Sequence, residues 1–438
     1  MAQISKTVGI FTLGCKVNQY ESEAIGELFE ARGYRVLSSL DPCDIYIVNT
    51  CTVTAESDRK ARQIIRRAIA KNPEALVLVT GCLAETAPES IARIAGVDFI
   101  GGNADKCAIV DAAERLLASG KNLSAETRIL PLDGAPFECM SIKRFDRTRA
   151  YVKIEDGCES HCTYCIIPKA RGAIRSKPPA DVIREVTALT ENGCREVVLT
   201  GIETASYGRD LGGYTLTDLL EEVDAIPNVG RVRLGSLDPS LMKQDFVDRI
   251  ARLRSLAPHF HLSMQSGSDN VLRLMKRKYN TEMALENIAR LRRALPRVML
   301  TTDMIVGFPG ESEEDFEKTL AFAEKAEFLT MHVFPFSGRR GTPAASMNGQ
   351  IPMELRRRRA AILSELQASI RKRVLEREIN EAPITEVLFE EYKDGYATGH
   401  TANFIEVRLR SDKDLRSESK RVRLLRTDGS ITDAEPLE

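Results

Sequence analysis

The sequence predicts an α/β protein in three parts: an N-terminal doubly wound parallel sheet, a central open (β/α)6 partial barrel, and a small OB-like β-barrel. Apolar strand-like runs alternate with helical stretches through residues 4–120, and the same unit recurs six times between residues 147 and 350. This alternation is typical of parallel sheets. After residue 383 the strand-like runs are short and separated by turn residues, which indicates a small β-barrel.

Composition limits the classes of protein to consider. A chain of 438 residues is long for one core, so we expect two or three domains. The net charge of −1 gives no overall sign of nucleic-acid binding. We see no signal peptide and no apolar run of membrane-spanning length, so we expect a cytoplasmic protein without membrane contact. Ten cysteines in such a reducing compartment favour metal or cluster ligation over disulfides.

In the first part, residues 4–120, three of the four expected strands end in a cysteine. The strands are expected at 8–15, 44–51, 75–82 and 97–102, and the helices near Glu21–Arg32, Arg59–Ala70 and 88–96. Cys15, Cys51 and Cys82 end the first three strands. Because open parallel sheets bind ligands at the carboxyl ends of their strands, three thiolates would reach one edge. The alternative is three unrelated buried cysteines.

The second part, residues 147–382, follows a connector at 121–146 that has turn residues and no clear period. Six strands are expected, at 150–158, 195–203, 231–239, 259–267, 299–308 and 329–337. A long basic helix follows at about Met353–Glu381, and the third part spans residues 383–438. Function in barrels belongs to the carboxyl ends of the strands and to the loops after them.

A cysteine motif lies just after the first of these barrel strands. Cys158, Cys162 and Cys165 form C-x3-C-x2-C. A four-iron cubane takes one thiolate per iron, so three thiolates leave one iron open to a substrate. The ferredoxin run of four cysteines is absent, so simple electron carriage fits poorly. Structural zinc would need a fourth ligand, for which His161 beside Cys162 is the candidate.

This motif, with Tyr164 before its last cysteine, resembles that of the radical S-adenosylmethionine enzymes. The resemblance implies that S-adenosylmethionine binds the open iron and is cleaved to a 5′-deoxyadenosyl radical. Residues after or at the ends of barrel strands would contact this cosubstrate; besides Tyr164 these are Gly201, Ser236, Gln265 and Asp303. The alternatives are an ordinary loop glycine and structural turn or cap roles. The loop Gly-Phe-Pro-Gly-Glu at 307–311 resembles the family's adenine-side loop.

The order of the three parts resembles the methylthiotransferases over nearly the whole chain. In that family the last part is a TRAM domain, and Cys15, Cys51 and Cys82 would hold an auxiliary four-iron cluster. The segments at 12–22, 333–345 and 394–407 resemble the branch that adds a methylthio group to C2 of N6-threonylcarbamoyladenosine beside the anticodon. His161, Lys169 and Glu203 depart from residues common in the family, and none of them is a predicted ligand.

The resemblance leaves alternatives open and implies partners. The same chemistry on isopentenyl-adenosine in tRNA or on a ribosomal-protein aspartate is one alternative, and an iron–sulfur redox or carrier protein is another. A cobalamin-dependent methylase is disfavoured because Asp-x-His-x-x-Gly is not found. The expected partners are tRNA carrying N6-threonylcarbamoyladenosine, a reducing donor such as flavodoxin, and a sulfur source.

Contact with tRNA is expected from the last part of the chain. Tyr396 and Phe404 could stack on unpaired bases, and Arg421 and Arg423 belong to a local basic cluster. The alternatives are that these aromatics belong to the core and that the basic helix is a solvated face. The remaining cysteines are interpreted as plain thiols; they are Cys43, Cys107, Cys139 and Cys194.

Overall fold

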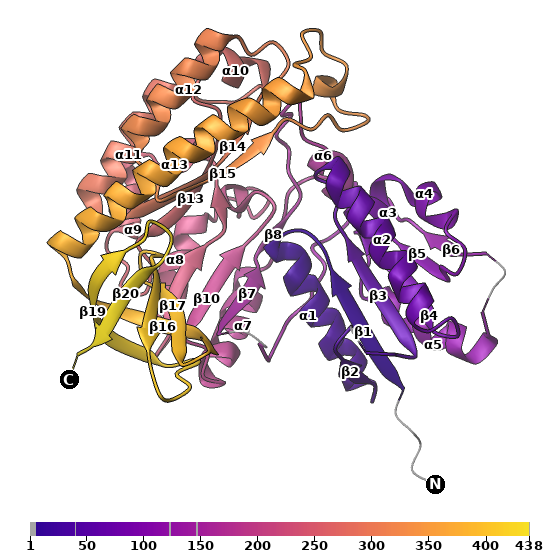
Figure 1. The fold of residues 1–438 in the computed structure, drawn as a ribbon. Coiled ribbons are helices and arrows are strands. Elements are labelled where there is room, and N and C mark those ends of the chain that lie inside the picture. The colour runs from indigo at the N-terminus through magenta and orange to yellow at the C-terminus, as the bar shows by residue number, and fades with distance from the viewer. Residues whose placement is uncertain (1–5, 40, 122–123, 146–147, 438) are drawn as a thin grey trace.

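The computed structural model describes residues 6–39, 41–121, 124–145 and 148–437, and Figure 1 shows the ribbon. The predicted domain limits at residues 4, 146, 147 and 438 lie outside the described residues. The N-terminal sheet and the central barrel lie side by side, and the small C-terminal barrel sits beneath the central one. In the part of the chain that is described, no helix is both long enough and apolar enough to cross a membrane.

The N-terminal sheet has six parallel strands in the order β2-β1-β3-β4-β5-β6. These strands are β1 Thr7–Thr12, β2 Arg35–Leu37, β3 Ile45–Thr50, β4 Leu76–Gly81, β5 Phe99–Gly101 and β6 Glu126–Arg128. The helices are α1 Lys16–Ala31, α2 Ala55–Lys71, α3 Cys82–Thr86, α4 Pro88–Ala92 and α5 Ala108–Ser119. Side chains of β3 and β4 are buried at every position, since α1 and α5 pack on one face and α2, α3 and α4 on the other. The doubly wound sheet is therefore confirmed.

The connector differs from the prediction. Residues 126–128 form β6, which pairs with β5 and becomes the edge of the first sheet. Three residues with exposed or half-buried side chains show no apolar alternation, so the sequence pattern gave no sign of a strand here. Helix α1 also begins earlier than expected, at Lys16 directly after Cys15, because no side chain caps its amino terminus and so no capping signal marks its start.

The central barrel contains all six predicted strands. They are β7 Arg149–Lys153, β10 Glu196–Thr200, β11 Arg231–Leu234 with β12 Ser236–Leu237, β13 His259–Gln265, β14 Met299–Val306 and β15 Thr330–Pro335. The third strand is divided at Gly235, so that β11 pairs with β10 and β12 pairs with β13, all in parallel. A Cβ at Gly235 would lie 2.9 Å from Thr200 Oγ1, so this seam requires glycine. The result is a partial barrel open between β7 and β15.

Helices cover the outside of this barrel. They are α7 Pro179–Glu191, α8 Leu216–Asp224, α9 Gln244–Ile250, α10 Asp269–Leu274, α11 Thr281–Ala294, α12 Glu313–Ala326 and α13 Met353–Glu381. Shorter elements line its loops: α6 Ile167–Arg171, β8 Glu155–Asp156, β9 Arg175–Ser176, and the 3-10 turns η1 Thr204–Ser206, η2 Pro239–Leu241 and η3 Pro343–Ala345. The basic run of α13 is partly internal. Arg359 is buried beside Glu311, and Arg356 donates to the carbonyl of Phe336 at 2.8 Å.

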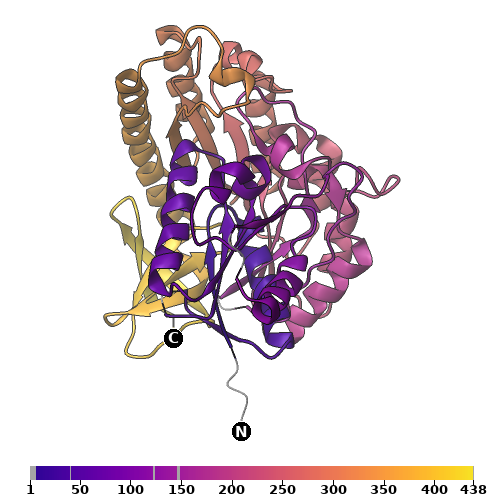
Figure 2. The ribbon, with the colours of Figure 1, turned by 90° about the vertical axis from the view of Figure 1, so that its right-hand side faces the viewer.

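The C-terminal part is a closed five-stranded barrel in the order β16-β17-β18-β20-β19. The strands are β16 Ile384–Lys393, β17 Tyr396–Thr401, β18 Glu406–Arg410, β19 Ser419–Thr427 and β20 Thr432–Pro436. This barrel docks on the amino ends of the central strands, where Arg233 donates to the carbonyl of Ala402 and Arg149 pairs with Glu390. The predicted small β-barrel is confirmed, and Figure 2 shows it below the central barrel with the N-terminal sheet in front.

Candidate catalytic centre with two cysteine triads

The first cysteine triad lies at the carboxyl edge of the N-terminal sheet. Cys15 follows β1, Cys51 follows β3, and Cys82 follows β4, and these three strands are neighbours in the sheet. Burial raises the pKa of Cys51 to about 11, and the nearby thiols of Cys82 and Cys15 raise it too. Gly14 adopts φ +104°, and a Cβ there would lie 2.8 Å from the Cβ of Cys51. Glycine at this position therefore allows the first and second loops to approach each other.

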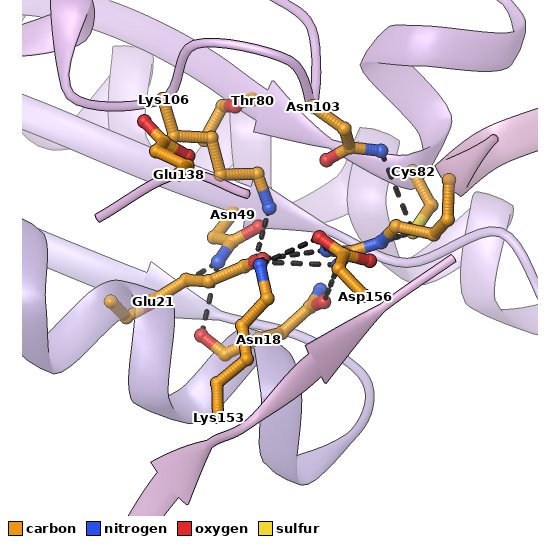
Figure 3. Close-up of polar contacts among 12 residues, drawn as sticks. Asn18, Glu21, Asn49, Thr80, Cys82, Asn103, Lys106, Glu138, Lys153 and Asp156 are labelled. Carbon is orange, nitrogen blue, oxygen red and sulfur yellow. Dashed lines mark hydrogen bonds and ion pairs between the residues drawn. The ribbon is translucent and has the colours of Figure 1, made fainter. Parts of the chain in front are cut away.

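A buried ion network joins this triad to the central barrel (Figure 3). The carboxylate of Glu21, on α1, is fully buried and pairs with Lys106, with Lys153 at 2.8 Å and with Arg171 at 2.6 Å. Burial alone would raise the pKa of Glu21, but Arg171 and the two ammonium groups hold it well below its ordinary range. Lys153 belongs to β7 and Arg171 to α6, so both reach Glu21 from the barrel.

The same network contacts a predicted cluster ligand. Arg171 Nε donates to Cys82 Sγ at 3.3 Å, and Asn103 Nδ2 lies 3.9 Å from the same sulfur. Asp156 is the second carboxylate of the network and pairs with Lys153 at 2.6 Å. Burial would raise the pKa of Asp156, but Lys153 and Arg171 lower it to about 2.

The charges of this network fit an anionic ligand at Cys82. The carboxylates of Glu21, Asp156 and the half-buried Glu85 face four cations, which leaves an excess of one positive charge around Cys82. The four cations are Lys106, Lys153, Arg171 and Arg175. Uncompensated buried charge is costly. A metal-bound cysteine is a thiolate, and so supplies negative charge where this excess lies. The residues present therefore fit a cluster held by Cys15, Cys51 and Cys82.

The second cysteine triad opens the loop after β7 and β8 at the carboxyl end of the central barrel. Backbone N–H groups point at two of its sulfurs, from Ser160 to Cys158 and from Ile167 to Cys165, both at 3.4 Å. Arg277 Nη1 donates to the sulfur of the third, Cys162, at 3.3 Å. Hydrogen bonds to ligand sulfurs are a normal feature of iron–sulfur sites. This triad therefore also fits a cluster.

The zinc alternative finds no support. Among the residues that the structure describes, no three histidine, cysteine or carboxylate side chains converge as they would on one ion. The His161 side chain is exposed to solvent. A cubane binds its thiolates to separate irons, so its ligands need not converge on one point.

The predicted cosubstrate residues occupy different depths of the barrel. Tyr164 packs edge-on against Phe308, with ring centroids 6.5 Å apart, in a small apolar cluster. Gly201 allows Glu155 to approach, because a Cβ at Gly201 would lie 2.5 Å from Glu155 Oε2. Gln265 ends β13 with φ +66°.

Ser236 and Asp303 both neighbour His261. Ser236 begins β12 opposite His261 in the register of the sheet. Asp303 lies 3.3 Å from His261 Nε2, inside the barrel and towards its middle. The structure thus brings Tyr164 and Gly201 to the loop that carries the second triad and places Asp303 deeper.

Two carboxylates at the barrel mouth were not predicted as site residues. Glu203 lies 3.1 Å from Cys158 Sγ and 3.2 Å from Ser160 Oγ. Burial raises the pKa of the Cys158 thiol, and the carboxylate of Glu203 raises it further. Burial also holds the pKa of Glu155 well above its ordinary range, and its Oε1 has no hydrogen-bond partner among the described residues. The only sign of a special role in the sequence was that Glu203 stands where members of the resembled family often have histidine or glutamine.

The predicted RNA-contacting residues divide into two groups. Tyr396, Arg421 and Arg423 are exposed on the C-terminal barrel, with Arg423 3.5 Å from Glu435. Phe404 requires a correction, because its ring already stacks on His259 and His400 at centroid distances of 4.4 and 4.7 Å. It packs the small barrel against the central one, so it is not free to stack on a base.

Comparisons with known proteins show which proteins this chain is similar to. Residues 152–323 match the Radical SAM superfamily, and residues 7–102 match "Uncharacterized protein family UPF0004". The chain is 38% identical to the "Threonylcarbamoyladenosine tRNA methylthiotransferase MtaB" of Bacillus subtilis, with 96% of this chain and 94% of that protein covered. The Thermotoga maritima protein of the same name is also 38% identical, with 98% of this chain and 96% of that protein covered.

A second enzyme name appears at lower identity. The "tRNA-2-methylthio-N(6)-dimethylallyladenosine synthase" of Aquifex aeolicus is 32% identical and covers 99% of both chains. Among solved structures, the radical S-adenosylmethionine methyltransferase TsrM of Kitasatospora setae matches with TM-score 0.55 at 15% identity, covering 78% of this chain and 75% of that one. At that identity the match shows a shared fold alone.

Proposed function

Because this chain belongs to the radical S-adenosylmethionine methylthiotransferase family, we propose that it adds a methylthio group to C2 of N6-threonylcarbamoyladenosine in tRNA. Relatives named for this reaction cover nearly all of the chain. One structural observation carries the proposal. Arg171 lies six residues after Cys165 and donates to Cys82, so the two cysteine triads are neighbours across the contact between sheet and barrel. A reaction that needs two clusters near one substrate needs this arrangement.

The cofactors are two [4Fe-4S] clusters and S-adenosylmethionine. When bound, they supply the electron, the carbon-centred radical and the methyl group of the reaction. Cys158, Cys162 and Cys165 would hold one cluster, and Cys15, Cys51 and Cys82 the other.

The chain's own residues orient these groups. Arg277 holds the sulfur of Cys162 from the barrel side. Glu203 is the carboxylate beside Cys158, and there it would accept a hydrogen bond from the amino group of S-adenosylmethionine. Tyr164, Gly201, Ser236, Gln265 and Asp303 remain proposed contacts of this cosubstrate.

The domain organisation and the partners are also proposals. Residues 4–120 would form the domain of the auxiliary cluster, with a connector at 121–146, a radical core with its basic helix at 147–382, and a TRAM-like barrel at 383–438. Exposed Tyr396, Arg421 and Arg423 would contact tRNA, the aromatic ring by stacking and the guanidinium groups at phosphates. A reducing protein such as flavodoxin, a sulfur source and a cytoplasmic location complete the proposal.

Nucleoside analysis tests the proposal directly. Transfer RNA from cells with and without this gene is digested, and the modified nucleosides are identified by mass spectrometry. We expect loss of 2-methylthio-N6-threonylcarbamoyladenosine and accumulation of its precursor without the methylthio group. Loss of the isopentenyl product instead, or of a methylthio mass on a ribosomal protein, would keep the chemistry and overturn the substrate. Unchanged tRNA and unchanged protein would overturn both.

A further inference from the structure

The central barrel encloses a cavity that none of the cluster or cosubstrate assignments uses. It has a volume of about 280 Å³ and lies among the amino-terminal halves of the strands. Four of the five histidines in the chain line it, namely His259, His261, His332 and His400. Lys16 also lines it, although it comes from α1 of the N-terminal sheet. The cavity therefore begins beside the first cysteine triad and continues into the barrel.

The positive charges around this cavity are unevenly compensated. Arg233 pairs with Glu196 at 2.9 Å, and Arg149 pairs with Glu390. Lys16 forms no ion pair among the described residues, although Asp303 attracts its ammonium from beyond ion-pair distance. Its side chain reaches solvent, and partial burial beside Arg149 lowers its pKa. Arg371 donates only to neutral oxygens, from Thr330 and Ser430, both at 2.6 Å. Glu406, which lines the cavity, attracts Arg371 but forms no ion pair with it among the described residues. The ammonium of Lys16 and the guanidinium of Arg371 therefore remain available to pair with an anion.

Two buried nitrogen atoms in the cavity lining also lack hydrogen-bond partners within the described residues. They are Nε of Arg371 and Nδ1 of His259. Buried polar groups are normally paired, so orphaned nitrogens beside a cavity indicate a polar occupant. An isopentenyl group would bury apolar surface against these charges and leave them without solvent or partner, which is costly. The chemistry of the lining favours an anionic, hydrogen-bonding substituent.

The position of Lys16 adds a geometric constraint. Lys16 directly follows Cys15, one of the proposed ligands of the auxiliary cluster. In adenine, C2 and C6 are both bonded to N1, so a substituent on N6 lies close to C2 on the same edge of the ring. A base presented with C2 at the auxiliary cluster therefore brings its N6 substituent near the residues that flank the cluster ligands. Lys16 is such a residue, and it faces the cavity.

We propose that this cavity receives the threonylcarbamoyl substituent and that the ammonium of Lys16 binds its carboxylate. This inference rests on the proposed function and specifies how the substrate is recognised. Lys16 is then a residue that determines specificity, because it distinguishes a carboxylate-bearing N6 substituent from an apolar one. Nε of Arg371 offers a further donor, and Nδ1 of His259 a further polar contact, in the same cavity.

The test compares two RNAs that differ only at this carboxylate. One anticodon stem-loop carries N6-threonylcarbamoyladenosine with a free acid, and the other carries its methyl ester. Binding to the reconstituted protein is measured by fluorescence anisotropy, and KM and kcat by methylthio product. We expect the wild-type protein to favour the free acid about 10- to 100-fold in Kd, the range for a hydrogen bond to a charged group. We expect Lys16→Met to reduce this preference to less than about threefold and Lys16→Arg to retain most of it.

The controls separate the inference from the function on which it rests. Lys60→Met removes an exposed lysine of α2 that does not line the cavity, and it should keep the wild-type preference. Repeating the binding comparison on metal-free protein removes any contribution from an altered cluster. A Lys16→Met protein that still prefers the free acid, or a wild-type protein with no preference, would overturn the inference. If wild type converted neither RNA but bound the acid through Lys16, the carboxylate site would stand and the proposed reaction would fall.

Discussion

Replacing Arg171 with methionine should destabilise the contact between the N-terminal sheet and the central barrel. The guanidinium is fully buried and donates to Glu21 at 2.6 Å, to Asn18 Oδ1 at 2.6 Å and to Asp156 at 3.2 Å. Methionine keeps much of the side-chain volume and removes every one of these donors. The variant therefore tests the polar contacts of Arg171 with little change in packing.

The size of the effect follows from two opposing contributions. Removing one partner of a buried ion pair typically costs about 3–5 kcal/mol. Here Glu21 keeps Lys106 and Lys153, and Arg171 repels both of these ammonium groups, so losing the guanidinium also relieves repulsion. We therefore expect the free energy of unfolding of the metal-free protein to fall by about 3 kcal/mol, at the lower end of that range. With thiolate ligands in place at Cys82 the loss should be larger, because the cation then has a third anionic partner.

Urea unfolding of the metal-free protein, followed by circular dichroism, measures the loss of about 3 kcal/mol that is expected without a cluster. The matched control is Arg184→Met, which removes an exposed arginine that pairs with Asp181 at 2.8 Å and should change stability by less than about 0.5 kcal/mol. Release of iron to a chelator measures the additional loss with thiolate ligands in place. It should be faster in Arg171→Met than in wild type. An Arg171→Met protein within about 1 kcal/mol of wild type, with unchanged iron release, would refute this account of the interface.

Three further predictions concern the clusters and the docking of the small barrel. Cys158→Ala should abolish both cleavage of S-adenosylmethionine and product formation, whereas Cys51→Ala should remove the product and leave some cleavage; normal product from Cys51→Ala would contradict the assignment of the first triad. Gly14→Ala should cost about 1–3 kcal/mol for its positive φ, and its Cβ would displace Cys51, so iron analysis should find about half the wild-type content. Burial raises the pKa of Glu196, but Arg233 and Arg149 lower it to about 2 from an ordinary 4.5. The ionised Glu196 should therefore contribute about 3 kcal/mol to the free energy of unfolding. This contribution should be complete above pH 4.5 and be lost as the pH falls towards 2. Glu196→Gln should flatten this dependence in acid-unfolding curves, and an unchanged curve would show that Glu196 is not the group responsible.

The sequence predicted the elements whose pattern is local. The six barrel strands and α13 carry continuous apolar or helical periodicity, and the structure contains all of them. The common position of the three strand-end cysteines was predictable as well, because the carboxyl ends of parallel strands lie at one edge of the sheet. The short edge strand β6 has no such periodicity, and the division of the third barrel strand depends on how closely Gly235 approaches Thr200. These features are decided by tertiary contacts that no local pattern contains.

The buried charges were not predictable for a different reason. Charged side chains are normally exposed, so nothing marks Glu21, Lys106 or Arg171 as internal. Their partners are distant in the sequence: Arg171 and Glu21 are 150 residues apart. Phe404 was misassigned for the same reason, since an aromatic residue near turn residues resembles a base-stacking side chain until its histidine partners are known. Only the assembled fold shows which charges and rings face inward.

The two cysteine triads are separate motifs in the sequence, yet one short helix connects them in space. Helix α6 begins two residues after Cys165 and ends at Arg171, whose Nε donates to Cys82. The loop that holds one predicted cluster therefore continues directly into a contact with a ligand of the other. Without the barrel, Glu21 would lose Lys153 and Arg171 and keep only Lys106 of its three cations. The N-terminal sheet alone would expose an incomplete ion network beside Cys82, so the environment of the auxiliary site is set by both domains together.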